Sequence, residues 1–191
     1  MDGGFISNNS LPRMSLKYKN ICYTPIWDFA TLVHVRDFKG HRAPITALCF
    51  QLKTNCVFSA SRDRSVKLWD LDQMGMVDTM YGHQDAVVAL SALQKQRVIT
   101  AGRQDRSCRL WKVEDESQLL FNGYSACVSM DCAAMLNDEH FVSGSADGYV
   151  ILSSKSVLNN VEFNTIPSLG HGFYCYCSYI FLCLKPFSAL L

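Results

Sequence analysis

The sequence predicts an all-β fold, an incomplete β-propeller of about three four-stranded antiparallel blades. Three pairs of marker residues recur at an interval of 42 residues: His41 and His83, Asp63 and Asp105, and Trp69 and Trp111. This interval lies within the roughly 40–45 residues of one propeller blade. Between the markers, apolar and polar residues alternate in short, evenly spaced runs, which is the pattern of strands. No stretch of the chain has a convincing helical period.

The outer copies of the repeat are partial. Trp27 stands 42 residues before Trp69, and in the third copy Tyr124 and Ser153 replace the markers His and Trp. The predicted organisation is the end of one blade at 20–38, complete repeats at 39–81 and 82–122, and a degraded repeat at 123–155. The expected strands are 26–28, 31–35, 45–50, 56–59, 66–69, 76–81, 87–93, 97–101, 107–113, 118–122, 128–135, 140–143 and 149–152.

The two ends of the chain lack the repeat. Residues 1–19 are expected to form a disordered leader. Residues 156–191 form a divergent apolar tail that we expect to lie outside the propeller. Its apolar run, 173–184, is shorter than the roughly 20 residues of a membrane anchor. An altered C-terminus that replaces the remaining blades therefore explains the tail better than an anchor, because a closed propeller needs at least about four blades.

Composition and charge exclude several classes of function. A net charge of +1 gives no overall attraction to nucleic acid or membrane, so any basic surface must be local. The nine cysteines are an odd number at irregular spacing, and no signal peptide precedes them, so reduced thiols in the cytosol or nucleus are expected. No metal ion, cofactor or small-molecule substrate is predicted. Phosphate-binding glycine loops, zinc-protease helices and nucleophile elbows are all missing, which predicts a protein that is not an enzyme.

His41, Ser59 and Asp63 resemble a hydrolase triad, but a structural role explains these residues better. His41 can donate to the Asp63 carboxylate and accept from the Ser59 hydroxyl. Ser59 lies inside a strand pattern and can accept from the indole N–H of Trp69. The four residues are therefore predicted to form one buried network that stiffens the blade, with no catalytic residue among them.

The set repeats, which a single active site would not require. The second repeat supplies His83, Thr100, Asp105 and Trp111, with one additional residue near 103–104. The third repeat retains only Ser143 and Asp147, so its network is expected to be broken and its blade weaker.

Arginines next to the markers are the candidate binding surface: Arg42, Arg62, Arg64, Arg103 and Arg106. The loops that hold them should open on one face of a propeller, where they would suit phosphate contact. The alternative is that they are solvated loop charges paired with Asp37, Asp72 or Glu114. No aromatic residues are interleaved with these arginines along the sequence, so the pattern gives no support to base stacking.

The Gly-His and Trp-Asp markers resemble those of the WD-repeat family, so the propeller is expected to be of the WD40 type. Some residue runs within the repeats are more specific than these general WD-repeat markers. The runs that resemble the family of U3 small nucleolar RNA-interacting WD-repeat proteins are 61–67, 81–87, 98–103, 109–112 and 116–121. The resemblance extends over about 26–154.

This resemblance implies a non-enzymatic, RNA-binding scaffold subunit of the U3 small nucleolar ribonucleoprotein in the nucleolus of the nucleus. The expected process is pre-rRNA processing in small ribosomal subunit biogenesis. The implied partners are U3 small nucleolar RNA, core proteins of the particle and a small kink-turn-binding protein, with no membrane. Two alternatives remain open: a generic WD-repeat adaptor that binds a peptide on its top face, and a truncated product without retained function.

Overall fold

The computed structural model describes residues 21–93, 97–123, 125, 127–147, 149–154 and 164–167, and all the regular structure in these residues is antiparallel β-sheet. A two-stranded leading sheet contains β1 (Tyr23–Trp27) and β2 (His34–Lys39). Blade 1 contains β3 (Ile45–Phe50), β4 (Cys56–Ser61), β5 (Ser65–Asp70) and β6 (Gly75–Tyr81). Blade 2 contains β7 (Val87–Ala92), β8 (Arg97–Gly102), β9 (Ser107–Lys112) and β10 (Ser117–Asn122). Blade 3 contains β11 (Met130–Met135), β12 (His140–Ser145), β13 (Tyr149–Ser154) and β14 (Asn164–Pro167).

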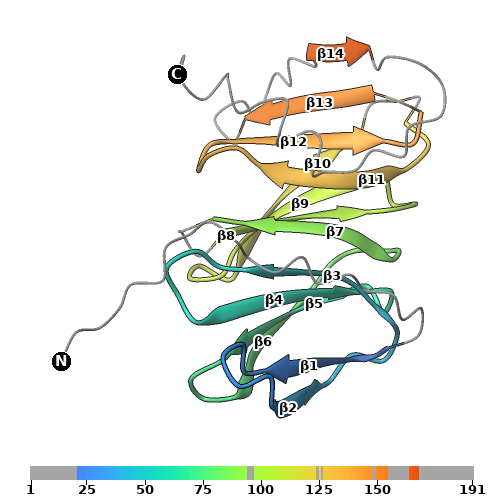
Figure 1. The fold of residues 1–191 in the computed structure, drawn as a ribbon. Coiled ribbons are helices and arrows are strands. Elements are labelled where there is room, and N and C mark those ends of the chain that lie inside the picture. Colours follow the sequence, from blue (N-terminus) through green and yellow to red (C-terminus); the bar gives the residue numbers. More distant parts are fainter. Residues whose placement is uncertain are drawn as a thin grey trace.

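The sheets stack face to face as neighbouring blades, and they do not close into a ring (Figure 1). In each blade the four strands follow one another in chain order. The first strands of neighbouring blades lie side by side, so β3 contacts β7 and β7 contacts β11. The prediction of an incomplete propeller with three four-stranded antiparallel blades is confirmed.

One strand of blade 3 comes from a segment that the sequence placed outside the propeller. The four residues of β14 lie within 156–191 and pair antiparallel with β13, with Tyr149 opposite Pro167. An open edge of β13 accepts any extended segment through backbone hydrogen bonds, so no repeat marker is needed there. The expected leader 1–19 and the apolar run 173–184 lie outside the described residues.

The strand expected at 31–35 is wrong, because a turn occupies most of that range. The Asp28 carboxylate accepts hydrogen bonds from the backbone N–H groups of Ala30 and Thr31 and from the Thr31 hydroxyl. These bonds hold 28–33 in a turn, and β2 begins only at His34. The same turn recurs between the third and fourth strands of blades 1 and 2. Residues with positive φ stand there at intervals of 42: Leu32, Met74 and Glu116.

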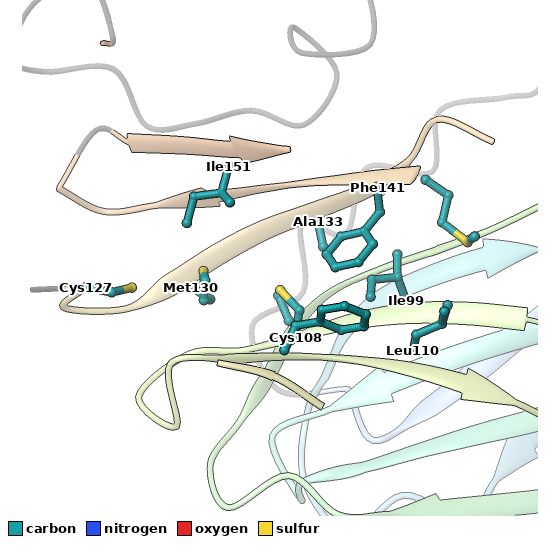
Figure 2. Packing of buried hydrophobic residues seen from close by; sticks show 11 residues of the cluster. Ile99, Cys108, Leu110, Cys127, Met130, Ala133, Phe141 and Ile151 are labelled. Atoms are coloured by element: carbon teal, nitrogen blue, oxygen red, sulfur yellow. The ribbon is translucent and has the colours of Figure 1, made fainter. Parts of the chain in front are cut away.

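The hydrophobic core lies between blades rather than inside one sheet. Alternation along β5 directs Val66 and Leu68 into the interface with blade 2, where they join Val87 and Val98. Along β9, Leu110 belongs instead to the interface with blade 3. Figure 2 shows that second interface, where the ring of Phe121 lies edge-on to Phe141 at 4.8 Å between centroids. Each blade is therefore stable only with its neighbours.

Within the described residues, no helix has the length and apolar character needed to cross a membrane.

Candidate functional site

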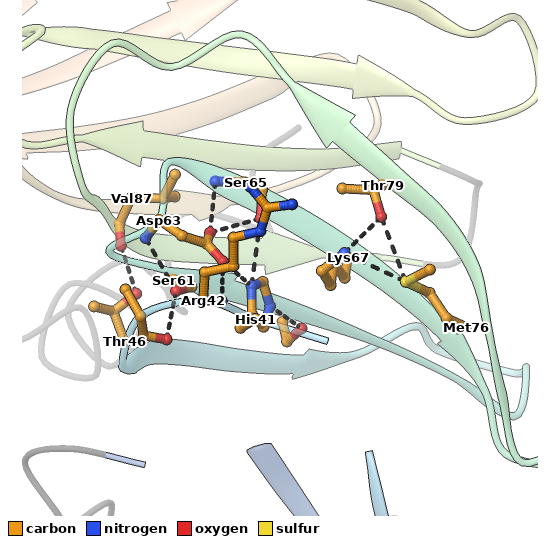
Figure 3. A network of polar contacts seen from close by, with 12 residues as sticks. His41, Arg42, Thr46, Ser61, Asp63, Ser65, Lys67, Met76, Thr79 and Val87 are labelled. Atoms are coloured by element: carbon orange, nitrogen blue, oxygen red, sulfur yellow. Dashed lines mark hydrogen bonds and ion pairs between the residues drawn. The ribbon is translucent and has the colours of Figure 1, made fainter. Parts of the chain in front are cut away.

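The first complete repeat joins its four marker residues in one chain of hydrogen bonds, part of which is drawn in Figure 3. The indole N–H of Trp69 donates to Ser59 Oγ over 2.8 Å, and the Ser59 hydroxyl lies 2.8 Å from His41 Nε2. His41 Nδ1 lies 2.9 Å from an Asp63 carboxylate oxygen. The chain of bonds ties the segment before β3 to β4, to the β4–β5 loop and to β5.

The charges in this network follow from its burial and hydrogen bonds. Burial raises the pKa of Asp63, but hydrogen bonds from the Ser65 hydroxyl, the Arg42 N–H and His41 outweigh it and lower that pKa to about 2. Burial lowers the pKa of His41, and the contacts with Asp63 offset this only in part. A neutral imidazole therefore donates from Nδ1 to an ionised carboxylate and accepts the Ser59 proton at Nε2.

The second repeat rebuilds the same network. His83 Nδ1 lies 2.6 Å from Asp105 and its Nε2 lies 2.8 Å from the Thr100 hydroxyl, to which the Trp111 indole N–H donates over 2.8 Å. The one-residue insertion in the β8–β9 loop brings Asp105 back against Gly102. A Cβ at that glycine would overlap both the Asp105 carboxylate and the His83 ring, so no larger residue fits there.

Neither network can serve as an active site. Ser59 and Thr100 are both 0% exposed, so no substrate can reach either hydroxyl. Within the described residues, no group of three or more His, Cys, Asp or Glu side chains is placed to hold a metal ion. The networks act on stability and on loop position.

Among the described residues of blade 3, the corresponding network is not formed. The register places Ser153 opposite Phe141, as Trp69 stands opposite Val57, so Ser153 occupies the tryptophan position. Ser143 occupies the serine position, and no described residue accepts from or donates to either hydroxyl, although the residues are only 2% and 6% exposed. Asp147 lies exposed in the following turn, and Tyr124 lies outside the described residues.

A small cavity marks the place of the missing indole. Its volume is about 10 Å³, and it lies between blades 2 and 3. Its lining residues are Cys108, Phe121, Asn122, Met130, Phe141, Ser143, Ile151 and Ser153. The residue that packs on each tryptophan has changed as well. Phe38, Met80 and Asn122 follow one another at intervals of 42 residues. Phe38 stacks on Trp69, and Met80 shares a core cluster with Trp111. In blade 3 the polar Asn122 takes this place and lines the cavity together with Ser153.

The structure places the five candidate arginines at one end of blades 1 and 2, and all five are exposed. The backbone N–H of Arg62, in the β4–β5 loop, donates to the carbonyl of Pro44 just before β3. In the same way, the N–H of Arg103, in the β8–β9 loop, donates to the carbonyl of Ala86 just before β7. The Thr46 hydroxyl donates to the Val87 carbonyl, which holds the starts of β3 and β7 together. The arginine-bearing loops of both blades therefore open on the same face.

Two of these arginines have an unusual backbone conformation. Arg64 and Arg106 have φ angles of 70° and 52°, in the left-handed region that favours glycine or asparagine. The third repeat has Gly148 at this position of its sequence. A side chain at a left-handed position costs stability, and among the described residues Leu32, Lys53, Met74 and Glu116 also adopt this conformation.

Most of the arginines lack an acidic partner. Among the described residues, Arg103 alone of the five has a carboxylate within 4.0 Å, namely Asp131 at 3.9 Å. The partners considered from the sequence are engaged elsewhere or not in contact: Asp37 bonds to His34 and Asp72 to Asn55. The other four arginines therefore form no ion pair within 4.0 Å among the described residues, although the ionised Asp63 stands between Arg62 and Arg64 in the same loop.

Two features of this end of the molecule, one at Lys67 and one at Tyr81, were not visible in the sequence. Lys67 is only 6% exposed, and its amino group donates to Thr79 Oγ1 and lies 3.3 Å from Met76 Sδ (Figure 3). It therefore does not contribute to the basic face. Tyr81 ends β6 at the same end as the arginines, opposite Ser65, and is 71% exposed. Tyr81 directly precedes Gly82-His83, and this position in the repeat was the sequence signal that could have placed the tyrosine at the same end as the arginines.

Comparisons with known proteins bear on the geometry described above. The family model of the WD domain, G-beta repeat, matches residues 32–70 and 75–112. The chain contains WD40 repeats. Two solved structures are similar: U3-55K, with 42% identity and a TM-score of 0.67, and the WD40 repeats of RRP9, with 41% identity and a TM-score of 0.67. An uncharacterized WD repeat-containing protein of Schizosaccharomyces pombe is 40% identical over 156 residues.

These similarities cover unequal shares of the proteins compared. The alignments span 71% and 73% of this chain but 41% of each solved chain, and 77% of this chain but 29% of the yeast protein. The two matched WD40 repeats contain both complete hydrogen-bond networks. The degraded third repeat, with Ser153 in place of tryptophan, lies beyond the residues that the family model matches.

Proposed function

We propose that this chain is a non-enzymatic RNA-binding scaffold of the U3 small nucleolar ribonucleoprotein, acting in pre-rRNA processing and small ribosomal subunit biogenesis. Its partners would be U3 small nucleolar RNA, the core proteins of the particle and a kink-turn-binding protein, in the nucleolus. The likeness to U3-55K and RRP9, at 41–42% identity, supports this assignment. The chain spans 41% of each of those structures, so their complete activity is a proposal here.

The observation that carries the RNA-binding part is the arginine face. Five exposed arginines share one end of two neighbouring blades, and one of them has a carboxylate partner among the described residues. Guanidinium groups bind phosphate oxygens in a bidentate manner, so such a face suits an RNA backbone. The hydrogen-bond networks support it, because Asp63 holds the backbone N–H of Arg42 and the carboxylate of Asp105 holds that of Gln84.

The salt dependence of RNA binding tests this proposal. Filter binding of a U3 RNA transcript is measured over a range of salt concentrations for the wild-type chain and for the double variant Arg62→Gln/Arg106→Gln. Each phosphate contact adds roughly 0.7–0.9 to the slope of log K against log salt, so the double variant should flatten the slope by up to roughly twice that amount. Affinity should fall at every salt concentration.

The double variant Lys53→Gln/Lys112→Gln is the matched control. It removes two cations at the opposite end of the same blades, where β3 ends and β9 ends. The control should leave the slope at its wild-type value. Equal slopes for all three proteins would show that the arginines are ordinary loop charges, and would favour a WD40 adaptor that binds a peptide.

A further inference from the structure

Tyr81, an exposed aromatic side chain, lies beside the arginines of blade 1. Tyr81 is the last residue of β6, directly opposite Ser65 in the register, and Arg64 comes directly before Ser65. The tyrosine is 71% exposed, whereas its neighbour Met80 is 8% exposed and belongs to the core. The ring therefore contributes little to the packing of blade 1.

The neighbouring sheet continues this arrangement. Forty-two residues before Tyr81 stands Lys39, which is exposed and lies opposite Tyr23 in the leading sheet. Tyr23 is 39% exposed. The leading sheet thus ends in the exposed pair Tyr23 and Lys39, and blade 1 ends in Tyr81 beside the loop that holds Arg64. Strand pairing therefore brings an aromatic ring next to a cation at each of these two places, which the order of residues along the sequence does not show.

We propose that Tyr81 is a stacking platform for an unpaired RNA base, with the surrounding arginines binding the flanking phosphates. This inference rests on the proposed RNA-binding function and specifies its substrate as single-stranded rather than fully paired RNA. Bases of a duplex are stacked on one another and present only their edges, so a tyrosine ring gains nothing from them. An unpaired base offers its whole face, and stacking on an aromatic ring suits every base.

The test compares two RNA probes by fluorescence anisotropy: a labelled short oligouridine, and a fully paired RNA duplex of similar length. Tyr81→Ala should lose between about fivefold and a hundredfold in affinity for oligouridine, which is the typical contribution of one stacked base. Its affinity for the duplex and its salt slope should stay at the wild-type values, because the phosphate contacts are intact. Tyr81→Phe retains the ring and should bind oligouridine like the wild type.

Val77→Ala is the matched control, since Val77 is 56% exposed on the same strand but nearer its other end. Equal oligouridine affinity for Tyr81→Ala and Val77→Ala would overturn the stacking proposal, as would a parallel loss for both probes. If the Arg62/Arg106 variant flattens the salt slope while Tyr81→Ala has no effect, the stacking fails and the RNA-binding function stands. If the wild type binds neither probe in a salt-dependent manner, both fail.

Discussion

The substitution Trp69→Phe isolates the contribution of one hydrogen bond in the blade 1 network. Phenylalanine keeps an aromatic ring in the interface with Phe38 but lacks the indole N–H that donates to Ser59 over 2.8 Å. Ser59 remains bonded to His41, so its hydroxyl is not left without a partner. The variant therefore loses a donor and part of an aromatic contact, while the rest of the network persists.

The magnitude follows from these two losses. A buried hydrogen bond between neutral groups contributes about 0.5–1.5 kcal/mol. The rings of Phe38 and Trp69 lie nearly parallel with centroids 4.9 Å apart, and both residues are 3% exposed, so a smaller ring leaves unfilled space. A cavity of that kind adds a comparable cost. We expect Trp69→Phe to lower the free energy of unfolding by about 1–3 kcal/mol.

Urea unfolding followed by far-UV circular dichroism measures this change. Trp27→Phe provides the control, because Trp27 is 56% exposed and its ring contacts only the edge of His34 among the described aromatic residues. The control should change stability by less than about 0.5 kcal/mol, as surface substitutions do. Equal losses for the two variants would refute the view that the buried indole N–H stabilises the blade.

Two further predictions concern stability. The pKa of Asp63 is lowered to about 2 from 3.8 and its side chain is 11% exposed, so its ionised form stabilises the fold above that range. As pH falls from about 5 to 2, the wild type should lose about 2 kcal/mol more than Asp63→Asn in acid-unfolding measurements, and identical pH profiles would contradict this. In blade 3, Ser153→Trp restores the missing marker, yet the cavity there is about 10 Å³. The indole should overpack it and lower the melting temperature, by a destabilisation of about 1–3 kcal/mol; a higher melting temperature would show that the network can be rebuilt.

The fold and the two networks could be predicted from the sequence because their markers are fixed by spacing. A histidine, a hydroxyl, an aspartate and a tryptophan in one blade must stand at set distances along the chain to meet. Thr100 could be recognised although the loop after it is one residue longer. The strands of blades 1 and 2 follow from alternation between two buried faces, which is a strong signal in short, regular runs.

Other features could not be predicted because they depend on contacts between segments. β14 is held by backbone pairing alone, and backbone pairing leaves no pattern in the side chains. The turn at Asp28 replaced a strand because a short side chain accepts three local hydrogen bonds, although the apolar run after it favoured a strand. The aromatic character of the arginine face appears only when β6 pairs with β5 and brings Tyr81 opposite Ser65.

Blade 3 shows what the hydrogen-bond networks are needed for. It lacks the network, yet β11, β12 and β13 pair as regularly as in the other blades, and Phe141 and Ile151 are each 2% exposed in its core. The network is therefore not required for a blade to form or to pack. What blade 3 also lacks is an arginine in its second loop, which reads Ala-Asp-Gly at 146–148.

The two losses are connected through the aspartate. In blades 1 and 2 this residue binds its histidine, the backbone N–H after that histidine, and the start of the third strand. It thereby fixes the loop in which Arg64 and Arg106 adopt left-handed backbone conformations. A loop that presents charged side chains to a partner gains from such rigidity, because less conformational freedom is lost on binding. The aspartate that completes each network thus also positions the loop that presents Arg64 or Arg106, so loss of the aspartate should change both the stability of the blade and the position of that arginine.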